Sequence, residues 1–234
     1  MMYIKCKLMR ILVILSLIIC TSLHAQRVVN VDQTENVDRS MLQVVNGEPF
    51  SNTKFVRLVS GSPYFKDQWL RGKLTTPANQ IFNAGVYKLD LVDNNLHFLD
   101  NGKEKIATTA FKKVELTDSV TGENFVFIHS SFLHASAKKG WYLQLLTGKA
   151  SLYLYYDKQI MENRPYNSAT TEQSVRTVEQ FLLLAHNSFT LIKKVKNPVT
   201  YFPDHQDALQ THWNKSQGST EEKLKSLVTY YNSL

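Results

Sequence analysis

The strongest constraint on the fold is an alternation of apolar and polar residues with a period of two, which runs from Met41 to about Val195. This period places successive side chains on opposite faces of an extended strand. Turn pairs such as Asn46-Gly47 and Asn101-Gly102 separate the runs, and residues of these types readily adopt positive φ. The pattern therefore predicts an antiparallel β body over residues 41–196.

The clearest predicted hairpin joins residues 141–146 to residues 150–156 through a turn that contains Gly148. Both faces of this hairpin are substantially apolar, so we expect it to be central or covered on both sides. Its aromatic rings could pack across strands in a core, or stack on a sugar or an apolar ligand. The candidate ligand-binding residues are Trp141, Tyr142, Tyr153, Tyr155 and Tyr156.

A second hairpin is predicted from Val178–Leu184 to Phe189–Val195, with a turn at residues 186–188. The stretch before it, residues 158–175, has no clear apolar period, and we expect a long loop there.

The chain changes character at Asn197-Pro198, and residues 197–234 predict a pair of helices packed on the sheet. The first helix is expected from Pro203 to about Lys215, with proline in its first turn. Ser219 and Glu222 have the spacing of a capping box, which opens a second helix with one apolar face. The predicted fold is mainly β with a C-terminal α-helical hairpin, the sheet forming an antiparallel sandwich or a curved half-barrel.

The first 25 residues have the layout of a secretory signal peptide. Basic residues precede an apolar run over residues 11–20, and a small residue, Ala25, stands at the expected cleavage site. The apolar run is too short to span a bilayer. We therefore expect an exported protein, periplasmic or extracellular, with a flexible leader over residues 26–40. Lipid anchoring at Cys20 is disfavoured because the bulky Ile19 precedes it.

Removal of the first 25 of 234 residues leaves 209 and lowers the formal net charge from +7 to +4, because that segment carries three basic and no acidic residues. Both cysteines, Cys6 and Cys20, leave with it. The remaining chain is predicted to be cysteine-free, which excludes disulfides and thiolate chemistry. Its lysine pairs fall at strand ends, where they discourage edge-to-edge aggregation, and no nucleic-acid partner is predicted.

Three stretches carry a resemblance to a family of proteins of unknown function. They are Gly61-Ser-Pro-Tyr-Phe65 with Trp69 and Gly72, residues 87–104 (YKLDLVDNNLHFLDNGKE), and residues 227–232 (LVTYYN), together with the Ala25-Gln26 exit. In these the chain resembles exported, β-rich proteins of Bacteroidota-type bacteria. The resemblance implies an envelope or secreted location and a β-rich body, and it implies no catalytic residues.

Motifs that carry chemistry are sparse. His129, Ser131 and His134 bring a potential nucleophile near a base, but no Gly-x-Ser-x-Gly elbow accompanies them. His205 and His212 would lie about 10 Å apart along a helix, too far to share a metal ion. The carboxylates of the β body lie mostly at turns or on polar strand faces, where we expect solvated charge, and no pair among them is singled out; they are Asp90, Asp93, Asp100, Glu104, Glu115 and Asp118. No metal and no cofactor are predicted.

These observations favour an exported binding or structural module of the cell envelope, without catalysis. Its partner would be an envelope component or an apolar ligand. One alternative is a carrier of lipid or another apolar ligand inside a curved sheet, with the helices as a lid. The other is an exported hydrolase that uses His129, Ser131 and His134.

Overall fold

A computed structural model of the chain describes residues 47–49, 57–166, 170–193 and 195–234. The chain divides into two units, Met1–Glu35 and Asn36–Leu234, and all described residues belong to the second. The predicted signal peptide and leader lie outside the described residues. Among the described residues, no helix has the length and apolarity needed to cross a membrane.

The cysteine prediction needs a correction for the chain as a whole. The chain contains Cys6 and Cys20, so the full chain is not cysteine-free. The term applies only to the part that would remain after the expected cleavage.

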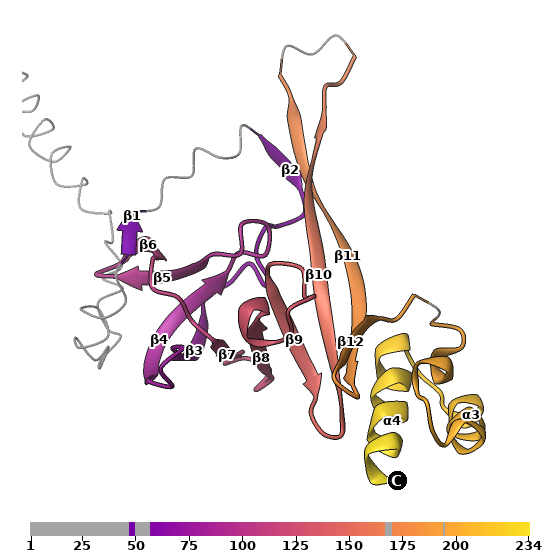
Figure 1. Cartoon of the computed structure of the whole chain (residues 1–234). Helices are drawn as coiled ribbons and strands as arrows, with labels where there is room; N and C mark the ends of the chain where they lie inside the picture. Colours follow the sequence, from indigo (N-terminus) through magenta and orange to yellow (C-terminus); the bar gives the residue numbers. More distant parts are fainter. Residues whose placement is uncertain (1–46, 50–56, 167–169, 194) are drawn as a thin grey trace, which may run out of the picture. The chain divides into compact units, whose positions relative to one another are not determined.

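The described residues form twelve strands in one sheet, followed by two α-helices (Figure 1). The strands are β1 (Gly47–Pro49), β2 (Leu58–Ser60), β3 (Leu70–Thr75), β4 (Ile81–Leu89), β5 (Leu96–Asp100), β6 (Lys103–Ala107), β7 (Lys113–Thr117), β8 (Asn124–His129), β9 (Trp141–Leu146), β10 (Ala150–Asn163), β11 (Glu172–Ala185) and β12 (Ser188–Leu191). The helices are α3 (Gln206–Lys215) and α4 (Thr220–Ser233).

The strand order is β1-β6-β5-β4-β3-β7-β8-β9-β10-β11-β12, with β2 paired to β11. All of these pairs are antiparallel except β2 with β11, which is parallel. The mainly β fold with C-terminal helices is confirmed, and the strands form one open sheet rather than a sandwich of two. Gly47, predicted in a turn, instead begins β1 and pairs with Ala107.

The longest strands are β10 and β11, which pair along their whole length without a bulge. Ala150 is opposite Ala185 at one end of this ladder, and Asn163 is opposite Glu172 at the other. The prediction of a loop over residues 158–175 is wrong, because both strands continue through most of it. Their far half extends past β9, and the short strand β2 pairs with it at Gln173 and Ser174 (Figure 1). Most side chains of this half are exposed or half-buried, and its sequence lacks the apolar alternation that marks a half-buried strand. The turn from β11 to β12 uses His186 and Asn187, both at positive φ.

One hydrophobic core lies on a single face of the sheet and continues into the helices. Leu74, Val114, Phe127 and Leu152 contribute fully buried side chains from β3, β7, β8 and β10. From α3 and α4, Leu209 and Leu227 belong to the same cluster and are also fully buried. Burial of these apolar surfaces is the main source of stability in a fold without disulfides.

The two helices begin differently. At α4, Ser219 accepts from the N–H of Glu222 and the Glu222 carboxylate accepts from the N–H of Ser219, which confirms the capping box. The predicted start of the first helix at Pro203 is wrong, since α3 begins at Gln206 after His205 at φ 58°. The intervening Asp204 lies outside the helix and accepts a hydrogen bond from the Tyr231 hydroxyl at 2.9 Å. This contact holds the chain away from helical geometry until residue 206.

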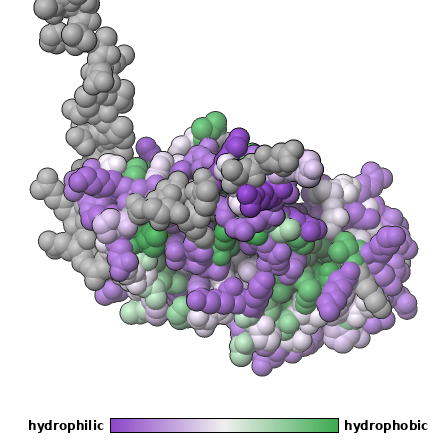
Figure 2. Space-filling model, turned by 90° about the horizontal axis from the view of Figure 1, so that it is seen from above, coloured by the Kyte–Doolittle hydropathy of each residue, from purple (hydrophilic) through white to green (hydrophobic). Residues whose placement is uncertain are grey.

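The surface seen from above is mainly hydrophilic, and hydrophobic side chains form smaller patches within it (Figure 2). Such a mixture is normal for a folded domain, and a specific binding site therefore has to be sought in its local geometry.

Candidate functional site

The loop that joins β8 to β9, residues 130–140, folds over the face of the sheet opposite the main core. A pair of contacts closes its base: the N–H of Ser130 donates to the carbonyl oxygen of Gly140 at 2.9 Å, and the N–H of Gly140 donates to Ser130 Oγ at 3.2 Å. Gly140 has φ 147°, a backbone conformation that favours glycine. Compact loops whose ends are close in space often carry function.

A second hydrophobic cluster lies beneath this loop and is built on Tyr142, Tyr153 and Tyr155. Leu133 and Ala137 of the loop pack against it. Two hydroxyls hold the loop's end: Tyr142 donates to the Lys138 carbonyl at 2.9 Å, and Tyr155 donates to the Lys139 carbonyl at 3.5 Å. Burial raises the pKa of Tyr142 to about 12, so its hydroxyl remains protonated, and able to donate, at neutral pH.

The five predicted ligand-binding residues do not form one surface. Trp141 and Tyr156 belong to the main core face, whereas Tyr142, Tyr153 and Tyr155 lie on the opposite face. Four of them are buried, and Tyr156 is half-buried. The predicted two-faced hairpin is therefore correct, but its rings are covered by the rest of the protein. A ligand-binding role for these rings stays a prediction, and none of the five is among the residues that line the pocket of the adjacent loop.

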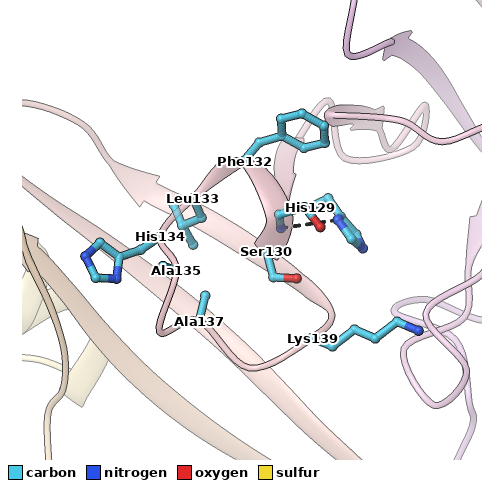
Figure 3. Close-up of a pocket in the computed structure, with 9 residues that line it drawn as sticks. His129, Ser130, Phe132, Leu133, His134, Ala135, Ala137 and Lys139 are labelled. Carbon is cyan, nitrogen blue, oxygen red and sulfur yellow. Dashed lines mark hydrogen bonds between the residues drawn. The ribbon is translucent and has the colours of Figure 1, made fainter.

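That pocket lies within the loop and has a volume of about 620 Å³. Its size falls in the range of sites for small molecules. The lining combines two imidazoles and an ammonium group with apolar side chains (Figure 3). The lining residues are His129, Ser130, Ser131, Phe132, Leu133, His134, Ala135, Ala137 and Lys139.

Both histidines of the pocket accept at Nδ1 from a backbone N–H two residues further along the chain, and His134 Nδ1 also lies 2.8 Å from Ser136 Oγ. His129 Nδ1 accepts a hydrogen bond from the N–H of Ser131 at 3.4 Å, and His134 Nδ1 accepts one from the N–H of Ser136 at 3.2 Å. A neutral imidazole that accepts at Nδ1 carries its proton on Nε2. In a Ser-His-Asp triad the polarity is reversed, because Nδ1 donates to the acid and Nε2 accepts from the nucleophile. In Figure 3 the two imidazoles also point to opposite sides of the loop.

The electrostatics of the pocket are set by Lys139 and His129. Burial and the charge of Lys139 lower the pKa of His129, burial being the larger cause. The imidazole also packs edge-on against Trp141, with ring centroids 5.0 Å apart. His129 is therefore neutral at pH 7, beside a permanent positive charge.

A buried polar cluster elsewhere in the sheet was not predicted from the sequence. His97 is fully buried, with Nδ1 2.7 Å from Glu104 Oε1 and Nε2 4.0 Å from Asp90 Oδ2. The expectation of solvation is wrong for Asp90 and Asp118, which are only 5% and 4% exposed. The usable signal was the turn at Asn101-Gly102, which places His97 and Glu104 on paired strands. Tyr64 lies edge-on to the imidazole at 5.4 Å, and this burial closes the cluster to a ligand.

The helices hold another histidine contact that was not foreseen. His212 Nε2 lies 2.8 Å from Ser226 Oγ, and its ring stacks on Tyr230 at 4.4 Å. This contact joins α3 to α4. In the part of the chain that the structure describes, no three His, Cys, Asp or Glu side chains form a group that could hold a metal ion.

No protein-family model, no curated protein and no solved structure matches the chain. The resemblance to exported β-rich proteins of Bacteroidota-type bacteria stays a prediction. The function is inferred from the pocket's own residues.

Proposed function

We propose that this protein is an exported binding module of the cell envelope, without catalysis, whose ligand occupies the pocket of residues 129–139. The observation that carries the proposal is that pocket, about 620 Å³ in volume, formed by a loop with fixed ends. The order of basic, apolar and small residues in positions 1–25 supports export.

Preorganisation of the loop supports a binding role. Its base is closed by the contacts between Ser130 and Gly140, and its last residues are held by the hydroxyls of Tyr142 and Tyr155. A loop held in its bound shape loses little conformational entropy when a ligand enters. A pocket supported by a β-hairpin is therefore suited to retaining a small molecule.

The hydrogen bonding of His129 favours binding over hydrolysis at this residue. A neutral imidazole that accepts at Nδ1 presents an N–H at Nε2 and has no free lone pair there to remove a proton from serine. His129 is held in this way by the N–H of Ser131. Its Nε2 is then a hydrogen-bond donor for a ligand.

A carrier site between sheet and helices has less support than the loop pocket. Leu152 of β10, Leu209 of α3 and Leu227 of α4 lie in one core cluster and each is 0% exposed. Close-packed interiors leave little room for a ligand without rearrangement. We therefore place the ligand in the loop pocket rather than between the sheet and the helices.

The test uses ¹⁵N-labelled protein purified from secreting cells and three probes with the same tail: octanoate, 1-octanol and octylammonium. We expect at least one probe to shift the amide signals of residues 131–139 saturably. Ala135→Trp should abolish the shifts by filling the pocket, whereas Ala110→Trp, at an exposed site outside it, should not. The proposal fails if no probe binds, or if the shifted amides lie elsewhere.

A further inference from the structure

Two adjacent lysines at the end of the loop differ in their surroundings. Lys138 Nζ lies 2.8 Å from Asp157 Oδ1, so its charge is compensated. Lys139 lines the pocket and is exposed, and no ion pair of Lys139 occurs among the described residues. An ammonium group without a neighbouring carboxylate creates a positive potential that attracts anions.

His129 lies on the same side of the loop as Lys139 (Figure 3). Its Nδ1 accepts from the N–H of Ser131 at 3.4 Å, so the neutral imidazole carries its proton on Nε2, where it can donate to a ligand. A second proton is added at Nδ1, in exchange for this long hydrogen bond. The charged groups on the adjacent strand are engaged elsewhere: Lys112 Nζ donates to Asn79 Oδ1 at 3.3 Å, and Lys113 Nζ lies 2.6 Å from Glu115 Oε1. Lys139 is the charged group whose field acts on this imidazole.

The rest of the lining is apolar. Phe132 is 41% exposed, a large exposed fraction for a phenylalanine in a pocket wall. Leu133, Ala135 and Ala137 add smaller apolar surfaces. A ligand with an apolar part would remove these surfaces from water and gain free energy in proportion to the area buried.

We infer that the pocket binds an amphipathic anion, a carboxylate with a short apolar tail, and that binding adds a proton to His129. This inference rests on the proposed function, of which it names the ligand class and the regulation. The carboxylate lies against Lys139 and His129, and the tail lies along Phe132 and the two alanines.

The link between anion and proton follows from the position of Lys139. In the free protein, its positive charge disfavours a second positive charge on His129. A bound carboxylate neutralises that charge and adds a direct partner for the imidazolium, so the pKa of His129 rises on binding. By thermodynamic reciprocity, protonation of His129 must then raise the affinity of the pocket for the anion. Affinity for octanoate should therefore increase as pH falls from 7.5 to 5.5, a range in which an aliphatic carboxylate stays mostly ionised.

The experiment measures dissociation constants of octanoate, 1-octanol and octylammonium at pH 7.5 and 5.5 by titration of the same amides. We expect octanoate to bind tightest, and about five-fold tighter at pH 5.5 than at pH 7.5. Lys139→Gln should raise the dissociation constant of octanoate by up to about five-fold. Lys103→Gln, which removes an exposed lysine far from the pocket in sequence, should leave the constant unchanged.

The variant His129→Asn tests whether protonation of His129 causes the pH dependence of octanoate binding. Asparagine can still accept from the N–H of Ser131 but does not titrate, so the pH dependence should disappear. His205→Asn removes a histidine outside the pocket, at positive φ where asparagine is tolerated, and should keep the pH dependence. In the unaltered protein, the His129 imidazole signals should titrate at higher pH with octanoate than without it, which tests the link even if a variant misfolds.

The outcomes separate the two proposals. If octanol or octylammonium binds in the pocket as tightly as octanoate, the anion inference is wrong while the binding function stands. If octanoate is preferred but its pH dependence persists in His129→Asn, the proton assignment is wrong. If none of the three probes binds, both proposals fail.

Discussion

The side-chain amide of Asn232 satisfies both backbone groups of Ala150: its nitrogen donates to the carbonyl oxygen at 2.9 Å, and its oxygen accepts from the N–H at 2.7 Å. Asn232 lies in the last turn of α4, and Ala150 is the first residue of β10. Gly148 makes the approach possible, because a Cβ there would lie 2.5 Å from the Asn232 nitrogen. The helix end thus acts on β10 as a neighbouring strand would.

Asn232→Ala should lower the free energy of unfolding by about 1–3 kcal/mol, because it leaves two backbone groups of a buried residue without partners. Asn232→Asp keeps an acceptor for the Ala150 N–H but loses the donor, and the loss of stability should differ from that of the alanine variant. Urea denaturation followed by circular dichroism measures both. An alanine variant as stable as the unaltered protein would mean that solvent replaces the amide without cost.

Gly85→Ala should also destabilise the fold, by about 1–3 kcal/mol, because the added methyl group would overlap the buried Tyr87 hydroxyl. The methyl group would also overlap Tyr87 Cζ and lie 2.8 Å from Cε2, and Tyr87→Leu, which removes all three atoms, should relieve the overlap. The double variant is then expected to be more stable than the sum of the two single effects predicts. Strictly additive effects in thermal denaturation would show that the strand shifts instead.

The parts of the fold that could be predicted are those with local causes. The capping box at Ser219 and Glu222 and the turn at Asn101-Gly102 depend on side chains within a few residues, and both are present. Alternation along residues 150–156 correctly separated Tyr153 and Tyr155 from Tyr156, because one face of the strand meets the core and the other meets the loop.

The parts that could not be predicted depend on distant partners. The far half of β10 and β11 is held by backbone pairing. Because this pairing does not require an apolar face, the sequence there shows no apolar period. His205 ends up before α3 because Asp204 is held by Tyr231, 27 residues away in sequence. The candidate pocket was foreseen only as a polar loop with histidines, because its volume depends on how residues 130–140 fold back over the tyrosines.

Asp118 should make stability depend on pH in the acid range. Lys66 Nζ and Gln68 Nε2 each lie 2.9 Å from Asp118 Oδ2, and the N–H of Val120 donates to Oδ1 at 2.9 Å. These hydrogen bonds, that of Lys66 foremost, lower the pKa of Asp118 to about 2. A carboxyl whose pKa is lower in the folded state stabilises the fold above its unfolded pKa of about 3.9, and this contribution is lost as pH falls toward 2.

Asp118→Asn should therefore be less stable than the unaltered protein at pH 7, and the difference should shrink between pH 5 and pH 2. Lys66→Met removes the largest cause of the shift and should flatten the same part of the profile. Urea midpoints at pH 7, 5, 3 and 2 measure the effect. A difference that stays constant down to pH 2 would contradict the assignment.

Tyr142→Phe should loosen the candidate binding loop without disturbing the sheet beneath it. The substitution removes the hydroxyl that holds the Lys138 carbonyl and keeps the ring in its cluster. A lost hydrogen bond of about 1 kcal/mol raises the population of locally open loop about five-fold. Trypsin cleaves after lysine, so cleavage after Lys138 and Lys139 should accelerate to a similar extent. Tyr153→Phe is the matched control, because Tyr153 lies in the same cluster but its hydroxyl bonds to Ser151. Equal cleavage of both variants would show that ring packing, and not the hydroxyl, fixes the loop.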